Sequence, residues 1–310
     1  MNPKRKILRT GLHSLRLSLR REFMSEFDFL SPKSLNTALR AISAKGRNYK
    51  LLSGGTNLIP YIRSQSASPR WVIDLSGIEA LRYLKEERGL IRIGALTTIS
   101  DLIDSKLIKN RAPLLWEAAS HFAGPIVRNR ATVGGNLVDA SPAADSAVPL
   151  LALKAQVKLR SLKGQRTLPL DQFFADYRKT AIRSGEILTE VAFPIPDRTA
   201  KFAYHKMGRR NAMAISVVSV GALLKMKGDT CREATIALGA VAPTPIRLWE
   251  AESLLQSKKV DLDLAQKCGE LAAESVRPIG DLRASADYRR QMCAVYVRKA
   301  ICQSVGLEND

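Results

Sequence analysis

The sequence predicts an α+β protein, in which runs of strands and runs of helices are segregated along the chain. A chain of 310 residues is longer than one ordinary hydrophobic core supports, so two or three domains are expected. No GxGxxG motif joins a strand to a helix, and no P-loop motif occurs, so neither common nucleotide fold is indicated. Toward the carboxyl end, three strand patterns are followed by three helical patterns.

The first third of the chain mixes short strands with one clear helix. Apolar residues recur at helical spacing over 34–45, where Ser34 is a suitable N-cap. Residues 49–52 and 71–75 are predicted strands, and 90–95 is predicted to belong to a small antiparallel set. These elements define the first part of an α+β domain.

The middle of the chain continues with helices and then strands. Helices are expected near 98–105 and 113–123, and an apolar helix is expected over 147–153. Strands are expected over 156–160 and 186–193. Prolines then interrupt the pattern, which places a domain boundary near residues 195–200.

The last third has a simple order. We predict a three-stranded antiparallel sheet followed by helices that cover one of its faces. The strands are expected at 202–207, 217–226 and 234–241, and the helices at 246–256, 263–276 and 285–305.

Composition and charge exclude several classes of protein. No run approaches eighteen apolar residues, which argues against a transmembrane helix. The four cysteines have no CxxC spacing, so neither a zinc site nor a disulfide scaffold is indicated. This cysteine pattern fits a reducing compartment, and a cytoplasmic protein is expected. The net charge of +20 raises the question of nucleic acid, but the charge is spread thinly and only 6% of residues are aromatic. A basic surface that is solvated or docks on an acidic partner is the preferred interpretation.

Part of the basic excess, +6 of the +20, lies at the amino end. Residues 1–23 hold seven Lys or Arg against one Glu, without the continuous apolar stretch of a secretory signal. A mitochondrial presequence has a similar composition, but we interpret residues 1–24 as an unstructured extension.

Two diglycine loops are the strongest signal for function. They are Ser53-Gly54-Gly55-Thr56-Asn57 and Thr132-Val133-Gly134-Gly135-Asn136. Glycine has no Cβ and can adopt positive φ, so such loops can present several bare amides to an anion. One such loop is often an ordinary turn. Two of them predict a ligand with more than one phosphate, held from both sides.

The segment from Phe122 to Leu137, continuing to Asp145, strongly resembles the FAD-binding subunit of the molybdenum hydroxylases, the family of xanthine and carbon monoxide dehydrogenases. Three further segments, 51–58, 173–180 and 206–210, resemble motifs of that family in the same order. The likeness covers about residues 26–305.

The resemblance implies a flavin fold of the vanillyl-alcohol-oxidase (PCMH) type. Residues 25–198 would form the FAD-binding domain, with α+β subdomains at about 25–80 and 81–198. Residues 199–306 would form a C-terminal domain like that of carbon monoxide dehydrogenase flavoprotein.

The resemblance also implies which residues bind FAD. The first loop would hold the pyrophosphate and the second would complete the cradle. Phe122 and Leu188 would be apolar walls for the rings, Asp145 would bond the adenosine or ribityl part, and Lys206 would lie near the flavin. Taken alone, Asp145 could simply cap the following helix. The implied set is Leu51, Leu52, Ser53, Gly54, Gly55, Thr56, Asn57, Leu58, Phe122, Thr132, Val133, Gly134, Gly135, Asn136, Asp145, Leu188 and Lys206, with no metal ligands and no catalytic side chains.

The implied function is electron transfer within a hetero-oligomer, a heterotrimer or a dimer of heterotrimers. A small subunit with [2Fe–2S] clusters would deliver electrons to the FAD, a large subunit would carry the molybdenum cofactor, and the acceptor would be NAD, oxygen or a quinone. A branch of this family has an extra iron–sulfur cluster, but no cysteine precedes Cys231 here. Two alternatives are a FAD- and NADPH-dependent reductase of the enolpyruvyl-glucosamine type and a basic nucleic-acid-binding protein.

Overall fold

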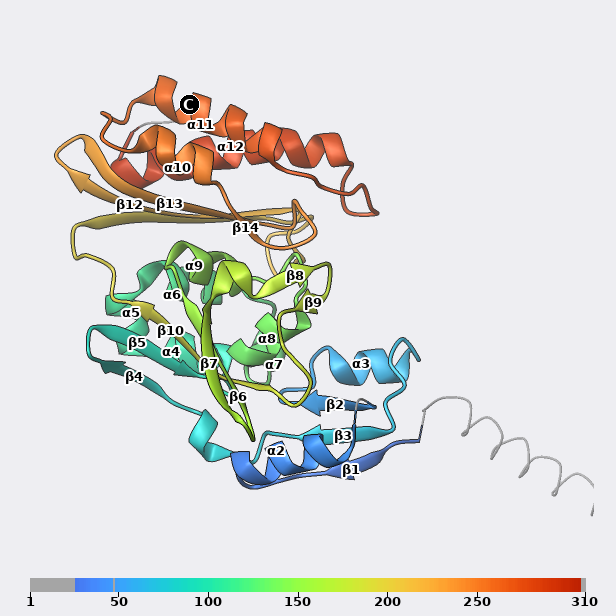
Figure 1. Cartoon of the computed structure of the whole chain (residues 1–310). Helices are drawn as coiled ribbons and strands as arrows, with labels where there is room; N and C mark the ends of the chain where they lie inside the picture. Colours follow the sequence, from blue (N-terminus) through green and yellow to red (C-terminus); the bar gives the residue numbers. More distant parts are fainter. Residues whose placement is uncertain (1–25, 47, 308–310) are drawn as a thin grey trace, which may run out of the picture.

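The computed structural model describes residues 26–46 and 48–307, so the predicted basic extension lies outside the described residues. Three main sheets follow one another along the chain (Figure 1). In that view the first sheet lies at the bottom, the second in the middle and the third beneath the helices at the top. Each sheet packs against its own cluster of buried apolar side chains.

The first sheet is parallel, with the strand order β1-β3-β2. Its strands are β1 (Asp28–Leu30), β2 (Tyr49–Leu52) and β3 (Trp71–Asp74), connected through α2 (Leu35–Ala44) and α3 (Leu58–Arg63). The predicted cap of α2 is confirmed, because Ser34 Oγ accepts from the amide of Thr37 at 3.2 Å. The parallel pairing was not expected from sequence. The crossover after β2 contains only a short helix with an internal proline, Pro60, which left no clear helical period.

The second sheet is antiparallel, with the order β4-β5-β10-β6-β7. The predicted strands and the helices at 98–105 and 147–153 are confirmed, and the helix expected over 113–123 ends at Ser120. The helix α5 was missed, because Ser105 ends α4 and caps the next helix at once. The elements of this part are β4 (Leu84–Glu87), β5 (Leu90–Gly94), α4 (Ile99–Asp104), α5 (Lys106–Arg111), α6 (Pro113–Ser120), α7 (Pro125–Arg128), α8 (Val133–Asp139), α9 (Ala147–Ala152), β6 (Gln156–Ser161), β7 (Gly164–Pro169), β8 (Phe174–Asp176), β9 (Lys179–Thr180) and β10 (Ile187–Pro194).

The third sheet has four antiparallel strands in the order β11-β12-β13-β14, so the predicted count of three was wrong. Residues 246–247 form β14 beside β13 instead of starting a helix, because Ile246 and Arg247 pair with Leu238 and Ala237. The elements are β11 (Ala200–Met207), β12 (Val218–Lys227), β13 (Thr230–Gly239), β14 (Ile246–Arg247), α10 (Trp249–Leu255), α11 (Leu262–Ser275) and α12 (Ala286–Val305).

Helices cover both faces of this third sheet. The helices α10 and α12 pack on the outer face, α11 packs on these two helices, and α6 and α9 of the preceding part pack on the inner face (Figure 1). Val148 of α9 illustrates how closely: a Cβ on Gly239 of β13 would lie 2.8 Å from its side chain. This close packing holds β11 against the helices of the second sheet's region. The candidate site lies at this junction. Among the described residues, no helix is both long and apolar enough to cross a membrane.

Candidate functional site

The first diglycine loop lies between β2 and α3. It packs closely against the segment between α7 and α8, in the part of the chain that forms the second sheet. A Cβ added to Gly54 would lie 1.7 Å from the carbonyl oxygen of Arg130, a distance that no side chain can tolerate. Gly55 has φ +75°, in the left-handed region that favours glycine. Both positions therefore require glycine, one for close approach and the other for backbone conformation.

The amides of this loop are available to a ligand. In residues 26–46 and 48–307, none of the amides of Gly54, Gly55, Thr56 or Asn57 donates to an acceptor within the protein. Asn57 is exposed, and the other three residues are half-buried. Backbone N–H groups that lack a partner at a partly buried position need an outside acceptor. These donors are free for an anionic ligand, and the anion grip itself stays a prediction.

The second diglycine loop works differently, and the prediction that it offers bare amides was wrong. The amide of Val133 donates to Thr97 O at 3.0 Å, and that of Gly134 donates to Ala95 O at 2.9 Å. The amides of Gly135 and Asn136 donate to the Oγ1 and O atoms of Thr132. These glycines permit close packing, because a Cβ on Gly134 would lie 2.7 Å from both Cβ and O of Ala95.

Side chains join the two loops. Ser53 Oγ lies 3.1 Å from Thr132 Oγ1, and a Cβ on Gly135 would lie 2.8 Å from both oxygens. Asn136 uses its Oδ1 to accept from the hydroxyl and amide of Ser146, which leaves its side-chain NH₂ to point elsewhere. The two loops therefore form one surface, in which the first supplies amides and the second supplies hydroxyl and amide side chains.

Asp145 and Lys206 lie together at the junction with the third sheet. Lys206 Nζ is 2.6 Å from Asp145 Oδ2 and donates to the carbonyl oxygen of His121 at 3.0 Å. The other carboxylate oxygen of Asp145 accepts from Ser216 Oγ at 3.1 Å. Both charged side chains are largely buried, with 6% of Lys206 and 12% of Asp145 exposed. Asp145 caps no helix here, since its bonds go to β11 and the segment before β12.

Burial perturbs the titration of this cluster. Burial raises the pKa of Asp145 above its ordinary value, although the Lys206 ammonium group opposes the shift. Burial also raises the pKa of the adjacent Tyr204, and the Asp145 carboxylate adds to that effect. The Tyr204 hydroxyl has no hydrogen-bond partner among the residues that the structure describes. An unpartnered polar group at such depth is rare in folded proteins.

The apolar residues of the predicted site belong to the core. Phe122 and Leu188 are 8% and 5% exposed and lie in the central hydrophobic cluster. Leu51 and Leu52 are half-buried at the end of β2, where Leu51 packs on the first core. Leu58 begins α3. The first loop is therefore anchored from the strand before it and the helix after it.

Sequence reasoning missed one contact that joins the first two parts of the chain. Arg178 donates to the hydroxyl of Tyr61 in α3, lies over that ring at 5.0 Å, and is 3.5 Å from Asp139 at the end of α8. The motif at 173–180 was recognised only as a family segment. Its side-chain role required knowledge of which helices come together, and no local pattern encodes that.

The fold and the loops define a class of protein, an α+β protein of several sheets with free backbone amides where its first two parts meet. A family model described as the FAD binding domain in molybdopterin dehydrogenase matches residues 25–196. A second, described as the CO dehydrogenase flavoprotein C-terminal domain, matches residues 202–304. The chain belongs to this family and is its FAD-binding subunit, an oxidoreductase component.

Curated relatives agree along almost their whole lengths. The chain is 33% identical to the carbon monoxide dehydrogenase medium chain of Hydrogenophaga pseudoflava, over 89% of this chain and 96% of the relative. It is 32% identical to the glyceraldehyde dehydrogenase medium chain of Sulfolobus acidocaldarius, over 89% and 97%. It is also 32% identical to the xanthine dehydrogenase FAD-binding subunit of Escherichia coli O157:H7, over 90% and 97%.

Solved structures show the same fold. The carbon monoxide dehydrogenase of Hydrogenophaga pseudoflava superposes with a TM-score of 0.89 at 32% identity, over 91% of this chain and 98% of that one. Quinoline 2-oxidoreductase of Pseudomonas putida 86 superposes with a TM-score of 0.86 at 26% identity, over 91% and 98%. The predicted α+β flavoprotein fold is therefore confirmed, and the cofactor is FAD.

The residues present fit that cofactor. FAD carries a pyrophosphate, and the free amides from Gly54 to Asn57 are the donors that an anion of this kind requires. A Cβ at Gly54 would fill the contact that brings this loop against Arg130. FAD, once bound, supplies the redox chemistry of such a subunit.

Proposed function

We propose that this chain passes electrons from [2Fe–2S] clusters of a partner subunit, through FAD, to an external acceptor that is NAD, oxygen or a quinone. The single observation that carries the proposal is the row of unpartnered amides where two parts of the chain meet. In the proposed complex a large subunit holds the molybdenum cofactor. FAD suits the role because a flavin exchanges electrons singly or in pairs.

The geometry suggests different roles for different groups of the predicted binding residues. The amides of Gly54 to Asn57 bind the pyrophosphate, and Thr132 and Asn136 complete the cradle. Lys206 already donates to Asp145 and His121, so one of its three N–H groups remains for the flavin end of the cofactor. We therefore revise the role of Asp145 from a direct ligand of FAD to the residue that positions Lys206.

An exposed apolar surface beside this cluster suits a partner subunit. We define it as Ile126, Met213, Ile215 and Leu282, which are 86%, 58%, 63% and 87% exposed. A Cβ on Gly124 would lie 2.9 Å from Met213 Sδ, and Arg209 donates to the carbonyl oxygen of Leu282 at 3.0 Å, so these segments adjoin. Large apolar side chains gathered at a surface are typical of protein interfaces.

The loop that carries Leu282 is held by ion pairs, which also supports docking. Asp281, next to Leu282, pairs with Arg283 at 2.5 Å and with the buried Arg289 at 2.8 Å. Arg289 in turn donates to the carbonyl oxygens of Val217 and Ala240. A loop fixed in this way presents Leu282 without a large ordering cost on binding.

Co-purification with the natural partners tests the proposal. Tagged wild-type chain is expected to retain FAD and to capture an iron–sulfur subunit, and substrate added to the complex should bleach the visible flavin band. Leu282→Asp is expected to keep its FAD but lose at least tenfold in affinity for the partner, whereas Val295→Asp, at another exposed apolar position, should retain it. Partner capture unchanged by Leu282→Asp would contradict the docking surface. A flavin that stays oxidised in the intact complex would contradict the electron path.

The two alternative functions are not favoured by any observation of the site. The carboxyl-terminal match assigns residues 202–304 to the flavoprotein family and not to the enolpyruvyl-glucosamine reductases. Binding of duplex DNA with a steep salt dependence would revive the nucleic-acid alternative.

A further inference from the structure

A pocket lies away from the diglycine loops, on the side of the molecule where α5 and α6 meet the third sheet. It has a volume of about 430 Å³, within the range of small-ligand sites. Its walls come from the end of α5, the start of α6, the end of α9, the connection between β10 and β11, and strands β11 and β12. None of these residues belongs to the FAD site described above.

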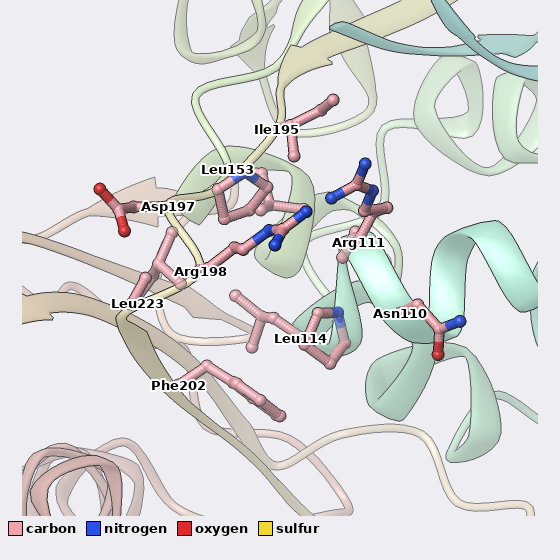
Figure 2. A pocket seen from close by; sticks show the side chains of 13 residues that line it. Asn110, Arg111, Leu114, Leu153, Ile195, Asp197, Arg198, Phe202 and Leu223 are labelled. Carbon is pink, nitrogen blue, oxygen red and sulfur yellow. The ribbon is translucent and has the colours of Figure 1, made fainter. Parts of the chain in front are cut away.

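The floor of this pocket is apolar. Leu114, Leu153, Phe202 and Leu223 line it, and Leu114 and Leu153 are almost completely buried. Figure 2 shows the Leu114 and Phe202 side chains beside one another below the pocket. An apolar floor of this kind favours a compact hydrocarbon body.

The rim carries positive charge. Arg111 and Arg198 both line the pocket, and Figure 2 shows their guanidinium groups extending toward one another across it. Arg111 uses Nε and Nη2 to bond Glu86, which leaves Nη1 as a free donor. Arg198 is exposed and has no ion pair or hydrogen bond within the described ranges. The unpaired Arg198 guanidinium, together with the free Nη1 of Arg111, can attract an anion.

Glu86 balances the charge of Arg111, but no carboxylate pairs with Arg198 among the described residues. Asp197 also lines the pocket, but its carboxylate accepts from the amide and hydroxyl of Thr199 and pairs with Lys225 at 3.1 Å. Figure 2 shows it turned away from both arginines. In addition, α6 begins at this pocket with Pro113 and has no side-chain cap, so its positive end adds to the field.

We propose that this pocket binds a small organic carboxylate with a compact apolar body, its carboxylate held by Arg111 and Arg198 and its body on the floor. Such a ligand would connect α5 and α6 to β11 and β12, and so stiffen the link between the second and third sheets. The proposal is independent of the function proposed above. It concerns a different surface and a different class of ligand.

Calorimetric titration of the FAD-loaded protein tests the proposal with benzoate, benzamide and acetate. Benzoate is expected to bind saturably in the millimolar range or tighter. Benzamide, which lacks the charge, and acetate, which lacks the body, should each bind at least tenfold more weakly. No saturable binding of benzoate, or equal binding of benzamide, would overturn the proposal, and this comparison needs no variant.

Substitutions in the pocket test whether benzoate binds there. Arg198→Ala should weaken benzoate at least tenfold, and Ala200→Trp, which fills the pocket from its half-buried rim, should abolish binding. Arg232→Ala is the matched control, since Arg232 is an exposed arginine on β13 outside the pocket. Benzoate affinity that survives both pocket variants, or that falls equally in the control, would place the anion elsewhere and overturn the proposal.

Discussion

Lys206 Nζ lies 2.6 Å from Asp145 Oδ2 in a largely buried ion pair that joins β11 to the segment before α9. The two residues come from the two halves of the chain that different family models match. Removal of one partner from a buried pair strands a charge, whereas the pair itself adds little net stability. The pair therefore positions groups at the junction more than it stabilises the fold.

Asp145→Asn is expected to lower the free energy of unfolding by about 3–5 kcal/mol, because the Lys206 ammonium group would be left buried without a counter-charge. Urea denaturation followed by circular dichroism measures this loss. Asp229→Asn is a matched control, since its pair with Lys259 is exposed and its loss should cost about 1 kcal/mol or less. An equal loss of unfolding free energy in the two variants would show that the Asp145–Lys206 pair is as solvated as the exposed pair.

Lys206→Met should make stability depend on pH with a definite sign. Burial already raises the pKa of Asp145, and loss of the opposing ammonium group raises it further. A carboxyl group whose folded pKa exceeds its unfolded value favours folding at low pH, and that contribution is lost as pH rises through the folded pKa. The stability deficit of the variant against wild type should therefore grow as pH rises from the unfolded carboxyl value of about 3.9 toward neutral pH. A deficit that stays constant over this range would contradict the assignment.

Gly54→Ala should be destabilising without any backbone strain of its own. Its Cβ would lie 1.7 Å from Arg130 O, so the two loops must separate, at a cost of about 1–3 kcal/mol. FAD retention after gel filtration should fall with it, because the same separation opens the cradle. Gly135→Ala meets only the side-chain oxygens of Ser53 and Thr132, which can rotate, and should be milder. Full FAD occupancy in Gly54→Ala would contradict the role of this contact.

Acid should release the loop that carries Leu282. Burial opposes ionisation of Asp281, but Arg283 and Arg289 outweigh it and lower the pKa of this carboxyl below its usual range. A lowered folded pKa contributes stability that is present above the unfolded value of about 3.9 and is lost as pH falls below it. The difference in stability between wild type and Asp281→Asn should therefore shrink from about pH 5 downward. A difference that does not change with pH would contradict the role of the Asp281 ion pairs.

The cysteines should be unreactive in the folded protein. All four are buried, and burial raises the pKa of Cys268 and of Cys293 to about 12. The thiolate is the reactive form, so thiol reagents should label the native chain only at the rate of local unfolding. Labelling with a chromogenic disulfide in the absence and presence of urea measures this. Rapid reaction of any one cysteine without denaturant would contradict the packing of the apolar cluster against the third sheet.

Local sequence patterns predicted most of the helices and strands, because these elements depend on interactions between neighbouring residues. The Ser34 cap, the strand at 49–52 and the proline start of α6 depend on residues within a few positions of one another. The elements that were missed depend on distant partners. Strand β14 exists only because β13 offers it an edge, and the parallel order β1-β3-β2 depends on crossovers that the chain does not mark.

The sequence by itself determined the α+β class, the family and the diglycine loops, since each is written in contiguous residues. Only the tertiary structure decided what each loop does. The amides of the second loop are consumed by Thr97, Ala95 and Thr132, while those of the first remain free. It also decided that Asp145 faces Lys206 and that Arg178 reaches Tyr61. Hydrogen-bond donors and charges are satisfied by whichever groups folding brings near, and sequence spacing does not specify those groups.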